Sequence, residues 1–326
     1  MPPPQQLLHP DQRSQPIGVF DSGVGGLSVL QALRAELPHE RFVYLADSAN
    51  APYGDARGDA FVGARSHAIA QHLQAQHGIK ALVVACNTAT AAAIHEVRAR
   101  YPALPLVGVE PALKPAVAAS RTGHIGVLGT RSTLTSAKFG KLLASLQGQA
   151  RFSVQPCDGL AHAIERSTAQ VLEHQAGQVR GSACGPDPAA PLASEAGVLC
   201  ARYTAALGAF GSAPGQIDTL VLGCTHYVFV QELLQQLVGA QVQILSTGGA
   251  VARQTRRLLQ AAGTLAPEGQ GQVHGQAPLP LLLTTGALAP LQNAAARWLQ
   301  WPADVCHQAG VPDPMEITAK SASSAH

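Results

Sequence analysis

Short apolar runs alternate along the chain with longer alanine-rich stretches. The apolar runs are rich in Val, Ile and Leu, which is typical of strands buried on both faces, and the alanine-rich stretches are long enough for helices. The runs predict strands at residues 17–20, 42–46, 81–85, 106–109, 125–128, 152–155, 219–222, 242–245 and 281–284. The stretches predict helices at residues 26–36, 59–76, 90–100, 133–146, 159–175, 193–209, 228–237, 249–262 and 287–299. This alternation favours an α/β fold built on parallel sheets.

Proline and glycine mark the segments between and outside these elements. Residues 178–194 are rich in both, which predicts a loop, and residues 263–278, rich in Gly and Gln, predict a second surface excursion. The proline-rich residues 1–16 are expected to form a disordered tail, and the Ser- and Ala-rich end, residues 304–326, a flexible one.

Two sequence patterns occur twice, in the same order. IGVFDS at residues 17–22 is matched by IGVLGT at 125–130, and LVVACNT at 82–88 is matched by LVLGCTH at 220–226. Short strands of this kind are common, so chance similarity is the alternative explanation, but the shared order favours two related α/β units. In each unit a cysteine follows the end of a buried strand, Cys86 in the first and Cys224 in the second.

Polar motifs stand where several of these strands end. In parallel sheets, ligands bind beyond the carboxyl ends of the strands, where the following helices begin. Three such motifs are Asp21-Ser22 with the glycines after it, Cys86-Asn87-Thr88 and Cys224-Thr225-His226. Each alone is also explained as a helix cap, whereas two copies in related halves favour a function. If the halves face each other, two thiols on opposite sides of a ligand suit removal of a proton from one face of a carbon and its return to the other, which is racemisation.

Six ordered blocks between residue 17 and about residue 303 carry a family resemblance. They read FDSGVGGLSVL, YLADSANAPYG, VVACNTATAAAI, GVEPALKPA, IGVLGTRSTL and LVLGCTHY. In these blocks the chain resembles the glutamate racemases of the cofactor-independent aspartate/glutamate racemase superfamily. The resemblance implies two pseudo-symmetric α/β domains, each a mainly parallel sheet flanked by helices, with the active site in the cleft between them. It also implies interconversion of L- and D-glutamate without a cofactor or metal, supplying D-glutamate for peptidoglycan synthesis.

The same resemblance assigns roles to individual residues. Cys86 and Cys224 match the catalytic acid/base cysteines, with Cys86 acting on D-glutamate and Cys224 on L-glutamate, while Asp21 and His226 assist proton transfer. Glu165 stands where the family has an acidic residue near the second cysteine. The residues that match substrate-binding positions are Asp21, Ser22, Tyr53, Gly54, Asn87, Thr88, Thr225 and His226. For Tyr53, which follows Pro52, a packed turn residue is the alternative; for Asp21, the sequence leaves open whether it binds the substrate ammonium or orients a thiol.

The resemblance also predicts the division of the chain. Residues 17–111 and 247–303 are expected to form the first domain and residues 112–246 the second. The chain departs from the family pattern at Val228, where proline is common, at Ser246-Thr247-Gly248 in place of Asp-Ser-Gly, and in the additional loop at 178–194. A homodimer is expected, although the loop leaves the subunit interface open.

Composition and charge restrict the possible partners. The chain has 326 residues, of which 46% are hydrophobic and 13% charged, with a formal net charge of +2. This balance disfavours nucleic acid as a partner, and the cluster Arg253, Arg256 and Arg257 is interpreted as a solvated helix face. A dicarboxylate held by main-chain N–H and hydroxyl groups needs no basic surface. No apolar stretch is long enough to span a membrane and no leader is recognisable, so we expect a cytoplasmic protein without a membrane partner.

The six cysteines contain no CxxC pair, which disfavours zinc or thioredoxin-like chemistry. They are expected to be free thiols in a reducing compartment, with Cys157, Cys184, Cys200 and Cys306 filling the core. Two alternatives to the main hypothesis remain: a racemase of aspartate or a related acid, which Thr225-His226 and the DSGVGG block disfavour, and a glutamate racemase with a second role as a DNA gyrase-binding inhibitor.

Overall fold

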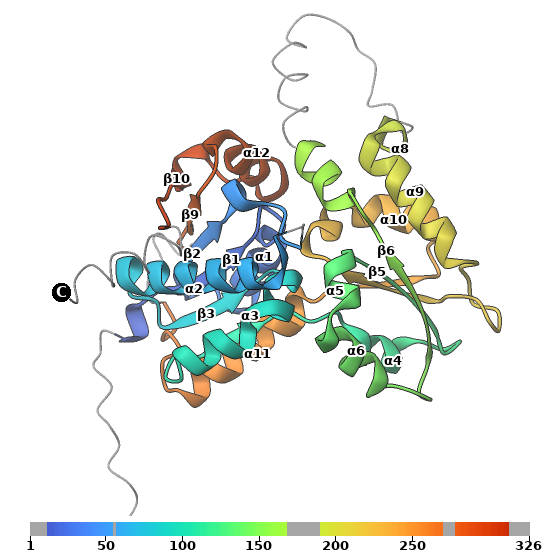
Figure 1. The fold of residues 1–326 in the computed structure, drawn as a ribbon, viewed down its shortest axis with the longest axis horizontal. Helices are drawn as coiled ribbons and strands as arrows, with labels where there is room; N and C mark the ends of the chain where they lie inside the picture. Colours follow the sequence, from blue (N-terminus) through green and yellow to red (C-terminus); the bar gives the residue numbers. More distant parts are fainter. Residues whose placement is uncertain (1–11, 55–56, 168–189, 270–277, 313–326) are drawn as a thin grey trace, which may run out of the picture.

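Two parallel sheets with helices on both faces form the protein (Figure 1). The computed structural model describes residues 12–54, 57–167, 190–269 and 278–312. The first sheet has the strand order β10-β9-β2-β1-β3-β4, and the second has the order β6-β5-β7-β8. We call each sheet with its helices a lobe, the first lobe holding β1 to β4, β9 and β10, and the second lobe β5 to β8.

The strands are β1 Ile17–Asp21, β2 Phe42–Ala46, β3 Ala81–Val84, β4 Leu106–Gly108, β5 His124–Gly129, β6 Arg151–Pro156, β7 Thr219–Gly223, β8 Gln243–Leu245, β9 Leu281–Thr284 and β10 Cys306–Gln308. The α-helices are α1 Leu27–Glu36, α2 Gly58–His77, α3 Asn87–Arg100, α4 Leu113–Ala119, α5 Arg131–Thr135, α6 Ala137–Ala144, α8 Ala190–Ala193, α9 Glu195–Leu207, α10 Gln231–Val238, α11 Gly248–Ala261 and α12 Leu288–Leu299. Residues 160–167 are also helical. Short 3-10 helices are η1 Gln12–Ser14, η2 Ser48–Asn50, η3 Thr225–Val230 and η4 Ala303–Val305.

The two lobes repeat one topology. The order β2-β1-β3-β4 of the first sheet corresponds to β6-β5-β7-β8 of the second. The repeated IGV segments are β1 and β5, and each pairs with the strand that precedes a cysteine: Ile17 lies opposite Ala81, and Ile125 lies opposite Thr219. The interpretation of the sequence as two related α/β units is therefore confirmed.

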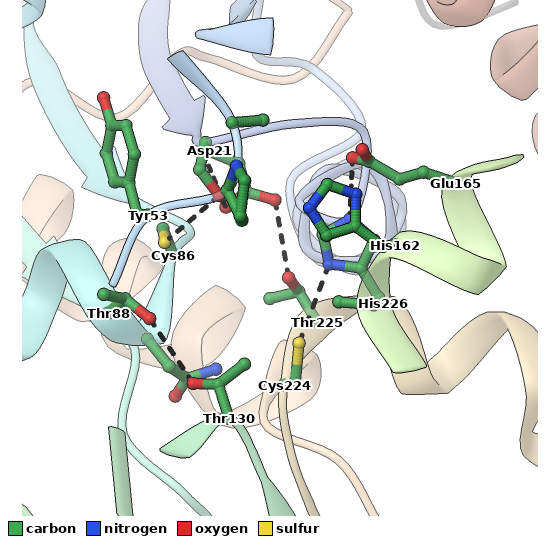
Figure 2. A pocket seen from close by; sticks show the side chains of 15 residues that line it. Asp21, Tyr53, Cys86, Thr88, Thr130, His162, Glu165, Cys224, Thr225 and His226 are labelled. Carbon is green, nitrogen blue, oxygen red and sulfur yellow. Dashed lines mark hydrogen bonds and ion pairs between the residues drawn. The ribbon is translucent and has the colours of Figure 1, made fainter. Parts of the chain in front are cut away.

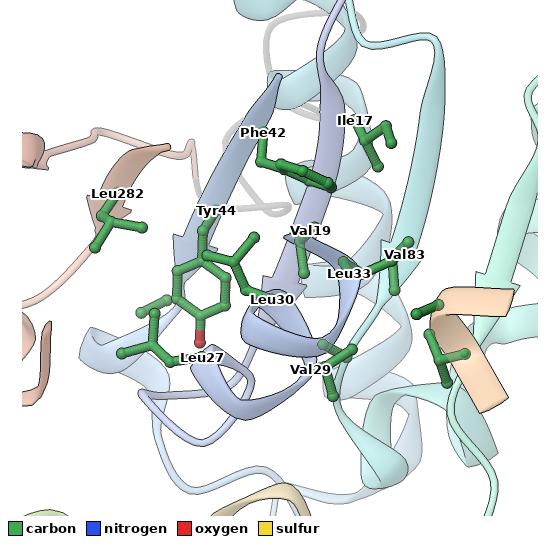
Figure 3. Packing of buried hydrophobic residues seen from close by; sticks show 14 of the residues in the cluster. Ile17, Val19, Leu27, Val29, Leu30, Leu33, Phe42, Tyr44, Val83 and Leu282 are labelled. Carbon is green, nitrogen blue, oxygen red and sulfur yellow. The ribbon is translucent and has the colours of Figure 1, made fainter. Parts of the chain in front are cut away.

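Four apolar clusters form the core, two for each sheet. Along β1, Val19 belongs to the cluster shared with α1, α11 and α12, whereas Phe20 belongs to the cluster shared with α2 and α3. Figure 3 shows Val19 with Leu30 and Tyr44 in the first of these clusters. Because both faces of each sheet are covered, the strands are apolar at successive positions, and hydrogen-bonding groups are left to the strand ends.

The chain enters the first lobe twice. After β8 it returns through α11, which packs on α1, and β9 then pairs with β2 beside β1. β10 continues this sheet, with Cys306 opposite Leu282. The flexible tail predicted from residue 304 is therefore wrong at its start. Three residues at a sheet edge have too little local pattern to be recognised, because their pairing with β9 is what makes them a strand.

Several predicted boundaries also differ. The helix predicted at 133–146 is two helices, because the Ser136 hydroxyl accepts from Phe139 N and caps a new start. Helix α4 was missed; its Pro115 lies in the first turn, where proline is tolerated. Residues 190–193 of the predicted loop are helical, while 178–189 lie outside the described residues.

The remaining predicted irregular segments are described only in part. Residues 12–14 of the predicted N-terminal tail form η1, while 1–11 lie outside the described residues. In the predicted excursion at 263–278, Thr264 and Ala266 are buried against the first lobe, and residues 270–277 lie outside the described part. Arg256 of the basic cluster forms an ion pair with Glu36. In the part of the chain that the structure describes, no helix combines the length and apolar character that crossing a membrane requires.

Candidate active site

Strand ends from both lobes meet around one cavity. Asp21 is the last residue of β1, Cys86 follows β3, and Cys224 follows β7. The cavity has a volume of about 50 Å³ and is shown in Figure 2. Its lining residues are Asp21, Ser22, Ala51, Pro52, Tyr53, Cys86, Asn87, Thr88, Thr130, Ala161, His162, Glu165, Cys224, Thr225 and His226. The fold thus brings together ten of the eleven residues singled out in the sequence.

The eleventh residue, Gly54, lies beside the cavity. Its φ is +90°, a conformation that favours glycine. A Cβ at this position would lie 2.3 Å from the Ser132 hydroxyl oxygen, across the boundary between the lobes. Gly54 therefore allows the loop after β2 to approach the second lobe closely.

Cys86 is held as a thiol on the first-lobe side. It is the N-cap of α3, with Ala89 N 3.4 Å from its Sγ, and the thiol donates to the Ser22 hydroxyl at 3.6 Å. Only 5% of its surface is exposed. Burial, reinforced by the charge of Asp21, raises the pKa of the Cys86 thiol far above its usual value. This rise favours the protonated form of the Cys86 sulfur.

Asp21 is fixed by main-chain groups. Its carboxylate accepts from Ser22 N at 2.8 Å and from Gly26 N at 2.5 Å, and Thr225 Oγ1 of the second lobe donates to it at 3.4 Å. Burial raises the pKa of Asp21, while the nearby His226 opposes this rise. The carboxyl group thus lies between the Cys86 side and the Cys224 side, as Figure 2 shows.

Cys224 lies in a different electrostatic environment. His226 Nδ1 is 3.6 Å from its Sγ, and His226 Nε2 is 2.8 Å from Glu165 Oε1. Burial lowers the pKa of His226, but its hydrogen bonds to Cys224 and Glu165 outweigh burial and raise it well above the usual value. Burial likewise raises the pKa of Glu165, but its hydrogen bond to His226 outweighs this and lowers it. Both directions describe an imidazolium–carboxylate pair, so positive charge lies next to the Cys224 sulfur.

Polar groups for a ligand line the space between the two sulfurs. The Asn87 side chain is buried, and neither its Oδ1 nor its Nδ2 has a hydrogen-bond partner among the described residues. Leaving a buried amide without hydrogen bonds costs about 1–3 kcal/mol of folding free energy. A polar ligand that hydrogen-bonds the Asn87 amide would remove this cost. The Thr88 hydroxyl lies 3.2 Å from that of Ser132 and 3.4 Å from that of Thr130, which places hydroxyl groups from both lobes together.

Tyr53 lines the cavity but its hydroxyl group points away from the sulfurs (Figure 2). The phenol donates to Asp47 at 2.6 Å, and the fully buried Asp47 also accepts two hydrogen bonds from Arg65, at 2.7 and 3.0 Å. Thr285, after β9, donates to the same carboxylate at 2.8 Å. Tyr53 is thus both a cavity residue and a packed turn residue, and the Asp47 carboxylate holds the loop that carries it.

Sequence reasoning missed five lining residues: Ala51, Pro52, Thr130, Ala161 and His162. Thr130 was within reach, because it is the second-lobe counterpart of Ser22 in the repeated segments. His162 lies three residues before Glu165 on one helix and therefore on the same face, a signal that depends on knowing which face meets the cavity. Ala51, Pro52 and Ala161 carry no chemical signal of their own.

We expect Asp47→Asn to destabilise the protein by about 3 kcal/mol, because it leaves the buried Arg65 without its charge partner. Burial raises the pKa of Asp47, but hydrogen bonds from Arg65 and Tyr53 outweigh it and lower the value. A lowered pKa gives stability that is present above the unfolded-state pKa and is lost as pH falls through the folded-state pKa. Urea unfolding from neutral to acidic pH should therefore show a weaker acid dependence in Asp47→Asn.

The control for this experiment is Glu268→Gln, which changes an exposed carboxyl group outside the helices. It should leave the unfolding free energy and its acid dependence unchanged. If Asp47→Asn matched this control, the Asp47 carboxylate would not hold the loop.

The chain is similar to a family of known proteins. The Asp/Glu/Hydantoin racemase family model matches residues 26–185. The chain is 46% identical to the glutamate racemase of Ectopseudomonas mendocina over 282 residues, 84% of this chain and 96% of that protein. It is 43% identical to the glutamate racemase of Ralstonia pickettii, over 87% of this chain and 88% of that one.

Solved structures agree with this similarity. Glutamate racemase isoform RacE1 from Bacillus anthracis matches with a TM-score of 0.72 and 29% identity, covering 93% of this chain and 99% of that one. Escherichia coli glutamate racemase in complex with L-glutamate and the activator UDP-MurNAc-Ala matches with a TM-score of 0.69 and 27% identity, covering 91% and 99%.

Proposed function

The chain belongs to the glutamate racemase family, and we propose that it interconverts L- and D-glutamate by transferring protons at the α-carbon with Cys86 and Cys224. The observation that carries this proposal is the unequal environment of two sulfurs in one cavity. Cys86 keeps its proton because burial and Asp21 raise its pKa, whereas Cys224 adjoins a cationic imidazole. Racemisation by two bases uses two groups in different protonation states, one to remove a proton and one to deliver a proton, and unequal surroundings of the two sulfurs suit this.

In the proposed reaction the Cys224 thiolate removes the α-proton of L-glutamate. The Cys86 thiol then delivers its proton to the opposite face, which gives D-glutamate, a Cys224 thiol and a Cys86 thiolate. The reverse reaction begins from that state, with Cys86 removing the α-proton of D-glutamate. No electron is lost or gained, and the number of protons on the pair of sulfurs is conserved.

The remaining lining residues bind and orient the substrate in this proposal. Asn87, Thr88, Ser22 and Thr225 supply amide and hydroxyl groups for the two carboxylates, and neither Arg nor Lys is among the described residues that line the cavity. This composition agrees with the low charge of the chain. Asp21 lies where it can accept from the substrate ammonium and also within reach of Ser22, which hydrogen-bonds Cys86.

The wider role of the protein follows from this activity. We propose that the D-glutamate supplies peptidoglycan synthesis and that the enzyme works in the cytoplasm, where a reducing environment keeps thiols free. The five cysteines in the described residues are free thiols, which supports this location; Cys184 lies outside the described residues. The homodimer, the gyrase-binding role and an aspartate substrate stay hypotheses.

Each of Cys86→Ser and Cys224→Ser should lower racemisation by about 100-fold or more, since positioned acid–base groups contribute about 10²–10⁴-fold. The measurement is loss of optical rotation and α-deuterium incorporation with L-glutamate in D2O, without added cofactor. Cys306→Ser, in β10 and remote from the cavity, is the matched control and should retain activity. Normal turnover in either active-site variant would exclude the two-thiol mechanism, and the same assay with L-aspartate tests the alternative substrate.

Replacing Glu165 by Gln should shift the alkaline limb of the pH profile. The change keeps an acceptor for His226 but removes the charge that raises its pKa, so His226 loses its proton at lower pH. We expect kcat/KM to fall about 10- to 100-fold, the equivalent of a charged hydrogen bond, with its alkaline limb displaced to lower pH. Glu195→Gln, at an exposed ion pair with Arg166, serves as control. A parallel loss at all pH values would contradict the role assigned to Glu165.

A further inference from the structure

Two consecutive residues of α12 reach from the first lobe to the second. Arg297 Nη1 donates to the Ser167 carbonyl oxygen at 2.6 Å and lies 3.3 Å from the Ser167 hydroxyl. The next residue, Trp298, stacks on Phe229 with ring centroids 3.7 Å apart and planes at 7°. Figure 1 shows α12 on the side of the first lobe that faces the second.

These contacts fall on the two segments that carry the partners of Cys224. Ser167 lies two residues after Glu165 on the helix of residues 160–167. Phe229 lies three residues after His226 in η3. A single helix of the first lobe therefore contacts both segments that carry the hydrogen-bonded pair, Glu165 and His226, whose atoms lie 2.8 Å apart.

The two cysteines differ in how their own segments support them. Cys86 directly precedes the 14-residue helix α3, and its sulfur caps that helix. Cys224 directly precedes η3, a six-residue 3-10 helix without a side-chain cap. Short 3-10 segments have poorer hydrogen-bond geometry than α-helices and gain less from cooperativity. The Cys224 side consequently depends on contacts from outside its own segment.

We propose that Arg297 and Trp298 are positioning residues for the group formed by Cys224, His226 and Glu165. The proposal rests on the proposed function, because it concerns the proton transfer made by Cys224. Trp298 fixes η3 through Phe229, and Arg297 fixes the end of the Glu165 helix through Ser167. Val24 N, 2.9 Å from Glu165 Oε1, adds a third contact from the first lobe. The Cys224 group is thus assembled in the second lobe and aligned by the first.

Isotope effects separate this role from a structural one. An α-deuterium is removed by Cys224 when the substrate is L-glutamate and by Cys86 when it is D-glutamate. If transfer at Cys224 becomes slower, the deuterium isotope effect on kcat/KM rises for L-glutamate and falls for D-glutamate. A variant that merely reduces the amount of folded enzyme lowers kcat in both directions and leaves both isotope effects unchanged.

The principal variant is Trp298→Ala. It should lower kcat/KM by about 10-fold or more, since small misplacements of reacting groups are costly. It should also change the two isotope effects in opposite directions and displace the alkaline limb to lower pH, as expected for Glu165→Gln. Trp298→Phe, which keeps an aromatic ring for Phe229, should restore most of the activity. Trp301→Ala is the matched control, because Trp301 lies under Arg34 within the first lobe.

A second variant keeps the test decisive if Trp298→Ala does not fold. Arg297→Ala changes an exposed residue and should alter the isotope effects in the same opposite directions, whereas Arg253→Ala, at an exposed position of α11, should not. Wild-type protein without racemase activity would overturn the proposed function. Active wild type, with unchanged isotope effects in folded Trp298→Ala or Arg297→Ala, would overturn the positioning role alone.

Discussion

One carboxylate oxygen, Glu165 Oε1, contacts both lobes at the cavity. Glu165 Oε1 lies 2.8 Å from His226 Nε2 within the second lobe, and Val24 N of the first lobe donates to it at 2.9 Å. The ion pair places positive charge beside Cys224, and the main-chain bond fixes the same carboxylate against the loop after β1. Glu165 consequently links the charge beside Cys224 to the alignment of the lobes, to which the contacts of Arg297 and Trp298 also contribute.

The repeated fold explains why two sulfurs meet, and the differences between the repeats explain why they are not equivalent. A cysteine follows each of the equivalent strands β3 and β7, so two facing lobes bring both thiols to one cavity. Cys86 shares its end of the cavity with a buried carboxyl group, which favours the protonated sulfur. Cys224 instead has the His226 imidazole 3.6 Å from its sulfur, and the pKa of that imidazole is raised. In the proposed mechanism one sulfur removes a proton while the other delivers one, so the difference between the repeats matters as much as their similarity.

Neutral polar groups replace basic side chains in this site. The Asn87 amide is buried and has no hydrogen-bond partner in the described part of the chain, and the hydroxyl groups of Thr88 and Thr130 lie 3.4 Å apart. The Asp47 carboxylate achieves similar order in the loop after β2, where it collects hydrogen bonds from Tyr53, Arg65 and Thr285. Such preorganisation lowers the cost of binding a small dicarboxylate.

The sequence by itself determined the alternation of strands and helices, the repeat, and the polar motifs at the strand ends. These features are local. Apolar runs of strand length predict strands that are buried on both faces. Parallel pairing then places Asp21, Cys86 and Cys224 at the carboxyl ends of their strands. Tertiary structure alone decided that residues 306–308 form a strand and that His162 faces the cavity. It also decided the contacts of Arg297 and Trp298. Each of these depends on partners distant in sequence, such as Leu282 for Cys306 and Phe229 for Trp298, whose proximity no local pattern encodes because tertiary packing creates it.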